Sequence, residues 1–357
     1  MAIFTDVFED VTKQGRKIPT SDYHETGLHP IVDQGQSAIA GYTDETDGLF
    51  TDVPAIIFGD HTRVLKYVDT PCFLGADGVK LLKAKIANPN YKYLYYVLSN
   101  ANIPNTGYNR HFKWLKEVDI PFPDAEEQQK VVDTLDKISE LITLRKDQLA
   151  KLDQLIKSRF IELFENEEYE KVTVSSVLNT GFWLMPATPE FVVDGEVPYI
   201  TSKNIKNRTI DFDNVKYISR EAYKSISANR PTQKGDILVS MIGTLGQTAV
   251  IQDDREFYGQ NLYLLRLNNA IVNTTYFCEF FNSDTAQYEL QGKRNQSTQA
   301  YLKANHVEDL ILPLPPMELQ KQFAAFVEQT DKSKLPIQQS LDKLELLKKS
   351  LMQEYFG

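Results

Sequence analysis

The chain has 357 residues, enough for two or three domains that each bury a core of their own. Apolar residues make up 42% and charged residues 25%, which is ordinary for a globular protein. The formal net charge of −10, taken alone, argues against a nucleic-acid binder, because such proteins usually carry a basic surface.

Several features predict a cytosolic protein without membrane contact. The N-terminal stretch MAIFTDVFEDVTKQG has acids where a secretory signal would have a basic region and an apolar core. Apolar runs such as DILVSMIG (236–243) are far shorter than a membrane span. Cys72 and Cys278 form neither a metal-ligand spacing nor a disulfide framework, which fits the same compartment.

The charge is unevenly spread along the chain. Residues 203–234 contain eight Lys or Arg against three acids, and basic residues without acids also occur at 109–116 and 293–303. Acids gather instead at 44–47 and 165–170. Because local sign matters more than the total when a partner docks on one face, the basic segments remain candidates for binding an anion. The alternative is that they are scattered, solvated lysines.

Residues 1–117 form the first predicted globular segment, and 118–164 follow it as a spacer helix. The spacer begins with IPFPDAEEQQKVV (120–132), whose prolines disfavour helix before them and fix extended geometry. Acids then occupy the first helical turn, where the helix dipole favours them. Apolar residues recur at three- and four-residue spacing, which predicts a long helix with a coiled-coil seam.

Residues 165–309 form a second globular segment that echoes the first. Both mix short β-branched strands with short helices, so the predicted class is α+β. The matching stretches are GLHPIVDQ (27–34) with GEVPYITS (195–202), AIIFGDHTRVLKYV (55–68) with DILVSMIGTLGQTAVI (236–251), and YLYYVLSN (93–100) with YFCEFFNS (276–283).

The last segment, 310–357, repeats the spacer helix. When Pro121–Phe164 is paired with Pro313–Phe356 without a gap, 12 of 44 positions are identical, which indicates internal duplication. Pro336 stands where the first copy has Leu144, and we expect it to break or kink the helix near Lys332–Pro336. The predicted seam residues are Leu135, Ile138, Ile142, Leu149, Leu152, Ile156, Val327, Ile337, Leu341, Leu344 and Leu351.

The duplication predicts the architecture. Helices of about 40 residues are roughly 60 Å long and would pair antiparallel about a pseudo-two-fold axis. The alternative is two ordinary amphipathic helices packed on separate domains. Off the seam, Leu141, Leu155, Leu335 and Leu347 either flank the core or form a partner-binding surface; we expect the core position.

Motifs for catalysis are absent from the sequence. It contains no Gly-x-Gly-x-x-Gly, no Walker loop, no His-Glu-x-x-His and no Asn/Asp-Pro-Pro-aromatic tetrapeptide. The histidines have no metal spacing, and Gly243-Thr-Leu-Gly246 is too short for a nucleotide fingerprint. The sequence predicts neither a catalytic residue, nor a metal, nor a cofactor.

The duplicated helix starts IPFPDAEEQQKVV and LPLPPMELQKQFA, with KGDILVSMIGTLGQTAVI (234–251), resemble the DNA-specificity (S) subunit of type I restriction–modification systems. The resemblance covers essentially the whole chain. It implies two target-recognition domains joined by long antiparallel coiled-coil helices. It also implies a non-catalytic reader of double-stranded DNA, on which two methyltransferase (M) subunits and then restriction (R) subunits assemble. The methyl donor and ATP would belong to those partners.

Within that resemblance, exposed Arg, Lys, Asn and Gln side chains would read base edges and phosphates. Gly243 and Gly246 would let the backbone approach DNA closely. In the first domain the candidates are His61, Thr62, Arg63, Thr106, Tyr108, Asn109, Arg110, His111 and Lys113. In the second they are Lys203, Asn204, Lys206, Arg208, Gly243, Thr244, Gly246, Gln247, Gln260, Asn261, Lys293, Arg294, Asn295, Gln296, Ser297 and Thr298.

The spacer helices would act as a ruler. About 60 Å spans less than two turns of B-DNA at about 34 Å each, so the predicted site is bipartite and asymmetric, with unread bases between its halves.

The alternative functions for the chain are a coiled-coil adaptor that binds proteins, a stand-alone nuclease and an RNA-binding module. The aromatic residues lie mostly in apolar runs typical of a core rather than of a base-stacking platform, which argues against the last.

Overall fold

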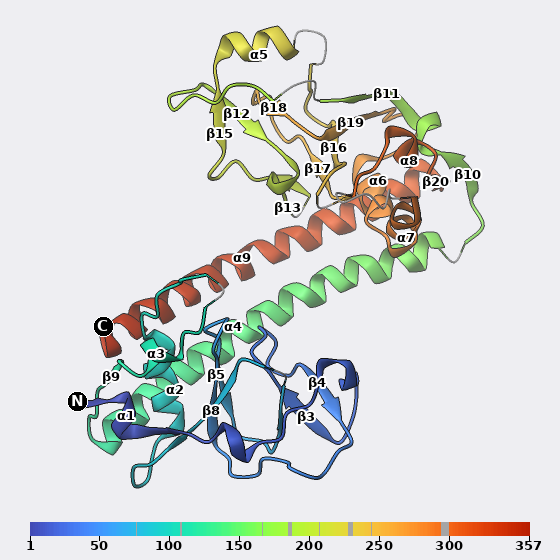
Figure 1. Cartoon of the computed structure of the whole chain (residues 1–357). Helices are drawn as coiled ribbons and strands as arrows, with labels where there is room; N and C mark the ends of the chain where they lie inside the picture. Colours follow the sequence, from blue (N-terminus) through green and yellow to red (C-terminus); the bar gives the residue numbers. More distant parts are fainter. Residues whose placement is uncertain are drawn as a thin grey trace. The chain divides into compact units, whose positions relative to one another are not determined.

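A computed structural model describes residues 1–75, 77–107, 109–165, 167–184, 188–206, 208–227, 231–243, 245–293 and 300–357. The chain divides into two compact units (Figure 1). Unit 1 comprises Met1–Asp147 and Gln338–Gly357, and unit 2 comprises Gln148–Ile337. Each unit therefore contains one of the globular segments, the first half of the helix that follows it, and the last half of the other long helix.

Unit 1 is built on two small sheets. The antiparallel sheet has the order β2-β8-β5-β6, and the second sheet has the order β4-β3-β7 with β3 and β7 parallel. Their strands are β2 (Phe8–Asp10), β3 (His29–Val32), β4 (Gly41–Thr43), β5 (Ala55–Gly59), β6 (Leu65–Val68), β7 (Phe73–Leu74) and β8 (Val79–Ala84). The other elements are β1 (Ala2–Ile3), α1 (Phe4–Val7), η1 (Thr12–Gln14), η2 (Thr20–Asp22), α2 (Tyr91–Asn100), α3 (Phe112–Leu115) and β9 (Asp119–Ile120).

Unit 2 repeats this plan with the same strand order. Its antiparallel sheet is β11-β19-β16-β17, and its second sheet is β15-β12-β18 with β12 and β18 parallel. The strands are β11 (Leu178–Trp183), β12 (Val197–Ile200), β15 (Lys216–Ile218), β16 (Ile237–Ser240), β17 (Thr248–Val250), β18 (Tyr258–Gly259) and β19 (Leu262–Leu267). The first two pairs of matching stretches predicted from sequence thus occupy matching strands, and the third pair lies on α2 and α6 (Thr274–Phe281), which confirms the internal repeat.

Unit 2 also carries an inserted hairpin of β13 (Ile205–Lys206) and β14 (Thr209–Ile210), which follows η5 (Ser202–Asn204) between β12 and β15. The corresponding connection in unit 1, residues 33–40, is described throughout and contains no strand. The remaining elements of unit 2 are β10 (Glu170–Thr173), η4 (Val174–Val177), α5 (Arg220–Ser227), α6 (Thr274–Phe281), α7 (Asp284–Lys293), α8 (Ala304–Glu308) and β20 (Ile311–Leu314).

The long helices are α4 (Ala125–Phe160), which continues as a π-helical turn at Ile161–Glu165, and α9 (Met317–Phe356). α9 runs without a break through Pro336, so the expected break is wrong and the expected kink stays a prediction. Proline costs a helix about 3 kcal/mol when nothing compensates it.

Contacts within each unit show that the helices run antiparallel. In unit 1, Val132 and Tyr355 belong to one apolar cluster, and Lys348 Nζ donates to Ser139 Oγ at 2.7 Å. In unit 2, the Phe160 and Phe323 rings lie 5.7 Å apart, and Lys334 pairs with Asp153 at 2.6 Å. The numbering of one helix rises as that of the other falls.

The predicted seam residues are buried or half-buried throughout. The off-seam leucines behave differently from the expectation. Leu155, Leu335 and Leu347 are 49%, 61% and 47% exposed, so the expected core position is wrong for them; Leu141 is half-buried. Leu155 and Leu347 occupy the same position in the repeat, which leaves equivalent apolar side chains exposed on α4 and α9.

The repeated proline segments have a shared structural task. In unit 1 the Tyr93 hydroxyl donates to the Pro121 carbonyl at 3.1 Å, and Gln128 Nε2 donates to the Pro123 carbonyl at 3.0 Å. Tyr276 and Gln320 do the same for Pro313 and Pro315 in unit 2, at 2.6 and 2.8 Å. The tyrosine bonds tie the start of each long helix to the short helix of its own unit, and the glutamine bonds hold the proline segment to the first turn of the long helix.

Each unit has one main core between its antiparallel sheet and its helices. In unit 1, Ile56, Phe58 and Leu82 pack with α2 and with Val131 and Leu135 of α4. In unit 2, β16 and β19 pack with α6, and the Phe164 ring lies 4.7 Å from Tyr276 and 5.2 Å from Phe323. Within the described residues, no helix is long and apolar enough to cross a membrane.

Candidate nucleic-acid interface

In unit 2, many of the predicted DNA-binding residues gather where the loops after β12, β16 and β18 meet. Gln260 N donates to the Ile200 carbonyl at 2.9 Å, and Met241 N donates to the Asn261 carbonyl at 3.2 Å. A side chain at Gly243 would lie 3.1 Å from Ser202 Oγ. These contacts bring residues 201–204, 241–243, 245–247 and 260–261 together, and we call them the unit 2 loop cluster.

The glycines of this cluster have a left-handed backbone conformation. Gly243 and Gly246 have φ of +86° and +74°, a region that L side chains avoid. Ser240 N donates to the Gln247 carbonyl, and Ser240 Oγ accepts from Gln247 N at 3.0 Å. The backbone of the turn is therefore fixed, while the Gln247 side chain stays exposed.

Unit 1 has the equivalent loops after β3, β5 and β7, which we call the unit 1 loop cluster. Gln34 lies at its centre, because its Oε1 accepts from His61 N at 3.3 Å and its carbonyl accepts from Thr62 Oγ1 at 2.6 Å. Its Nε2 donates to the Asp77 carbonyl at 3.0 Å. The sequence search for site residues missed Gln34. The match of GLHPIVDQ to GEVPYITS, which pairs Gln34 with Ser202, carried the signal.

The described part of the other predicted stretch of unit 1, residues 106–107 and 109–113, lies against this cluster. Arg63 Nη1 donates to the Ile103 carbonyl at 3.1 Å, and His111 N donates to the Asp60 carbonyl at 2.7 Å. Residues 40 and 51 positions apart in sequence are thereby brought together. Arg63 itself has φ of +63°, and its backbone N donates to the Gly59 carbonyl at 2.7 Å, so both its backbone and its guanidinium are held by neighbouring residues.

His111 is fully buried, although it was predicted among the DNA-binding residues. Its Nδ1 lies 3.0 Å from the Asp60 carbonyl, and its ring centre is 5.4 Å from that of Trp114. A side chain without exposed surface cannot contact a base edge. The geometry therefore gives His111 the task of holding the loop to the β5–β6 turn.

A basic edge borders the unit 1 loop cluster at α3. Arg110 and Lys113 are exposed, and Lys113 Nζ lies 4.1 Å above the Trp114 ring. Lys116 Nζ and Lys80 Nζ lie 4.9 and 5.0 Å from the Phe112 ring centre. Lys80 is paired with Asp10 at 2.8 Å, whereas the exposed ammonium groups of Lys113 and Lys116 suit phosphate contact.

The predicted residues of the unit 2 hairpin have different surroundings from one another. Lys203 is exposed, but Asn204 accepts from Thr201 N at 3.0 Å and donates to the Asp211 carbonyl at 3.1 Å. Lys206 pairs with Asp211 at 2.6 Å, and this hydrogen bond lowers the pKa of Asp211. Asn204 therefore shapes the loop, whereas Lys203 and Lys206 reach solvent.

Arg208, also predicted to bind DNA, is held by carboxylates. Its Nη1 pairs with Glu279 on α6, and its Nη2 lies 3.1 and 3.2 Å from the two carboxylate oxygens of Asp331 on α9. Burial raises the pKa of Glu279, and Arg208 opposes that rise. With both ends of the guanidinium engaged, Arg208 as it stands does not offer its charge to a phosphate or base.

Other candidates lie at the margin of the cluster or outside the described residues. Gln260 accepts from the Tyr199 hydroxyl and donates to Thr188 at 2.8 Å. Asn261 has φ of +59°, and Lys293 pairs with Glu289 at 2.6 Å. The predicted residues outside the described part of the chain are Tyr108, Thr244, Arg294, Asn295, Gln296, Ser297 and Thr298.

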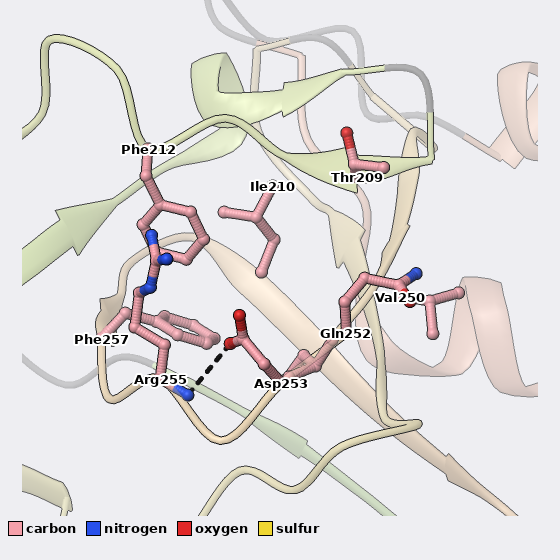
Figure 2. A pocket seen from close by; sticks show the side chains of 9 residues that line it. Thr209, Ile210, Phe212, Val250, Gln252, Asp253, Arg255 and Phe257 are labelled. Carbon is pink, nitrogen blue, oxygen red and sulfur yellow. Dashed lines mark hydrogen bonds between the residues drawn. The ribbon is translucent and has the colours of Figure 1, made fainter. Parts of the chain in front are cut away.

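A small cavity opens beside the inserted hairpin. It measures about 170 Å³, and Arg255 covers it with its guanidinium 4.4 Å above the Phe212 ring (Figure 2). Clefts for small organic ligands usually measure about 300–1,000 Å³, so this one does not indicate such a site. In the part of the chain that the structure describes, no group of three or more His, Cys, Asp or Glu residues is arranged to hold a metal ion.

Comparison with known proteins assigns the family. The model of the type I restriction modification DNA specificity domain matches residues 4–154 and 166–346. The chain therefore belongs to the type I restriction–modification specificity family, as the helix-start repeat predicted.

Two similar proteins are also described as specificity subunits of type I restriction enzymes. The chain is 29% identical over 231 residues to the EcoR124I/EcoR124II specificity subunit of Escherichia coli, covering 57% of this chain and 55% of that protein. It is 23% identical over 239 residues to the MjaIX specificity subunit of Methanocaldococcus jannaschii, covering 60% and 54%. The chain thus spans about half the length of these curated relatives.

Solved structures agree on the fold. The S subunit of a type I restriction–modification system from M. genitalium superposes with a TM-score of 0.59 at 16% identity, over 100% of this chain and 95% of that one. A second type I system structure gives 0.51 at 16% identity, over 99% and 95%. The predicted α+β fold with a pseudo-two-fold repeat and long antiparallel helices is confirmed.

Proposed function

We propose that this chain is the non-catalytic subunit that reads a bipartite, asymmetric site in double-stranded DNA for a type I restriction–modification complex. The observation that carries the proposal is the pair of loop clusters. They occupy equivalent places on sheets of the same strand order, yet present different side chains. Equivalent scaffolds with unlike loops suit two unlike half-sites.

The proposed division of the chain follows from this reading. Residues 1–117 and 165–309 are the recognition domains, and 118–164 and 310–357 are the spacer segments. A helix of 36 residues is about 54 Å long, which fits half-sites on one face of DNA less than two turns apart. The DNA would lie across the loop clusters and the basic edge at α3, in the cytosol.

The exposed leucines support partner binding. Leu155 and Leu347 share one repeat position and are about half exposed, so α4 and α9 offer equivalent apolar surfaces. Equivalent surfaces suit two copies of one partner, and two methyltransferase subunits fit that stoichiometry. The restriction subunits would join this assembly, with ATP and the methyl donor bound by the partners.

The test is sequence-specific DNA binding by the complex. The full chain co-purified with its methyltransferase should methylate one bipartite sequence, read by sequencing of modified bases. Its DNA affinity should fall by about 10³-fold or more between 50 and 200 mM salt, because several phosphates are contacted. The competing proposal is a protein-binding adaptor, which the exposed leucines also fit. Salt-insensitive binding or unselective modification would favour it.

A further inference from the structure

The inserted β13–β14 hairpin of unit 2 is joined to the long helices by a continuous set of charged side chains. Arg208 lies in this hairpin and pairs with Glu279 of α6 and Asp331 of α9. Asp331 also accepts from Lys334 at 3.0 Å, and Lys334 reaches Asp153 of α4 at 2.6 Å. We call Arg208, Glu279, Asp331, Lys334 and Asp153 the hairpin clamp.

The geometry of Arg208 is that of an anchoring residue. Its side chain is 27% exposed and that of Glu279 is 11% exposed, so this ion pair is largely shielded from solvent. Its backbone is fixed as well, with φ of +63° and a carbonyl that accepts from Val250 N at 3.1 Å. Breaking one partner of a shielded pair leaves an uncompensated charge, which makes the anchor hard to release.

The hairpin clamp lies close to residues that are proposed to contact DNA. Lys203 and Lys206, the exposed basic residues of this hairpin region, lie within a few residues of Arg208 on the same short insertion. The matching connection in unit 1, residues 33–40, contains no arginine and no hairpin. An anchor confined to one unit would influence one half-site and leave the other unaffected.

We propose that Arg208 is a positioning residue for DNA specificity: through Glu279 and Asp331 it fixes the inserted hairpin on α6 and α9, and so orients the reading residues of the second half-site. This inference rests on the proposed function. It assigns Arg208 an indirect role in place of the direct DNA contact that the sequence suggested.

The variant Asp331→Asn distinguishes an anchoring role of Arg208 from direct DNA contact by Arg208. Removing an acidic residue near DNA should by itself strengthen binding, so a loss of binding indicates that the acid supports the hairpin. If Arg208 is an anchor, Asp331→Asn weakens binding to the cognate duplex about tenfold, the loss typical of one mismatched base pair. If Arg208 contacts DNA, the same change frees the guanidinium and tightens binding. Glu328→Gln is the matched control, since it removes one acid from the same helix in an exposed pair with Lys332.

The experiment measures the affinity of the complex with its methyltransferase for three duplexes: cognate, altered in the first half-site and altered in the second. Arg208→Met and Asp331→Asn should both reduce discrimination at the second half-site only, with an unchanged slope of log affinity against log salt. Loss of a phosphate contact would instead reduce that slope by about one. Thermal unfolding tests whether each variant folds. If Arg208→Met does not fold, Asp331→Asn tests the positioning role alone, because Asp331 is less buried than Arg208.

The outcomes are distinct. Tighter or unchanged binding by Asp331→Asn, a reduced salt slope for Arg208→Met, or equal losses at both half-sites would each overturn the positioning role. A wild-type complex without sequence-specific binding would overturn the proposed function and this inference together. A wild-type complex that discriminates while the variants match it would overturn the inference alone.

Discussion

The structural role of a polar residue in this protein depends mainly on which partner its side chain hydrogen-bonds. Gln320 is fully buried; it accepts from Asn273 N at 2.8 Å and donates to the Ile271 and Pro315 carbonyls at 3.3 and 2.8 Å. Asn273 in turn caps α6 by accepting from Thr275 N and Tyr276 N. One side chain thus connects the start of α9 to the cap of α6.

Replacing Gln320 with Leu should destabilise unit 2 by about 3 kcal/mol, because each buried group left unpaired costs roughly 1–3 kcal/mol. The two tryptophans allow the units to be followed separately: Trp183 reports unit 2 in a Trp114→Phe background, and Trp114 reports unit 1 in a Trp183→Phe background. The readout is the urea midpoint of tryptophan fluorescence.

Gln128→Leu is the matched control, at the same repeat position. Gln128 is only half-buried and donates to the Pro123 carbonyl, so its loss should lower the unit 1 midpoint by clearly less. Equal shifts in the two units would contradict the argument that burial of the glutamine decides its energetic weight.

The two thiols should be inert in the folded protein. Burial raises the pKa of Cys72 to about 11 and that of Cys278 to about 12. Since the thiolate is the reactive form, the pKa shift alone should slow modification at pH 8 by about a hundredfold or more relative to an ordinary cysteine. Labelling with a thiol reagent should be slow natively and fast in guanidinium. Native labelling at the rate of free cysteine would show that these residues are accessible.

At the scale of the element, the repeat predicts where each long helix begins. α4 starts at Ala125 and α9 at Met317, a separation equal to the spacing of the proline segments. Proline geometry, first-turn acids and seam spacing are local properties, and they determine helix extent. The predicted seam residues are buried or half-buried, and one polar residue outside that prediction also bridges the two long helices. Lys348, at the position of Ile156, is partly buried, which lowers its pKa, and it bonds Ser139.

Lengthening the spacer should lengthen the unread gap. Four residues inserted after Lys151 add about 6 Å and slightly more than one turn, which nearly preserves the facing of the seam. The unread gap should grow by about two base pairs at roughly 3.4 Å each. Lys343 is the same residue at the matching repeat position, so an insertion there should have a similar effect.

Sequencing of methylated sites measures the gap directly. An insertion of equal length after Asp194, in an exposed turn of unit 2, is the control and should leave the gap unchanged. An unchanged gap in both helix insertions, with the proteins folded and active, would exclude the ruler.

At the scale of the whole molecule, the repeat predicts the stoichiometry of the complex. Leu155→Glu or Leu347→Glu should each remove one methyltransferase copy, because a charge in an apolar contact is strongly unfavourable. The double variant should bind none. Native mass spectrometry of the purified complex counts the copies.

Leu28→Glu is the control for this prediction, since Leu28 is 71% exposed, directly precedes β3, and its backbone N donates to Asp44 Oδ1 at 3.0 Å. It should leave both copies bound. If the single variants lose both copies or neither, the partner does not use equivalent surfaces on α4 and α9.

The sequence alone determined the duplication, the class, the long helices and the family, because proline spacing, apolar periodicity and ungapped identity are read along the chain. It also placed candidate residues in equivalent turns of both units. It could not determine which polar residues face outward. The sequence predicted DNA contact for His111, Asn204 and Arg208, and it did not identify Gln34 as a site residue.

Only the tertiary structure decided the cases of His111 and Arg208, because their partners lie far away in sequence. The partners of Asn204, Thr201 and Asp211, are local. Asp60 engages His111 across 51 residues, and Asp331 engages Arg208 across 123. The energy of a polar group depends on whether such a partner lies within about 3 Å once the chain has folded. Local sequence contains no record of that distance.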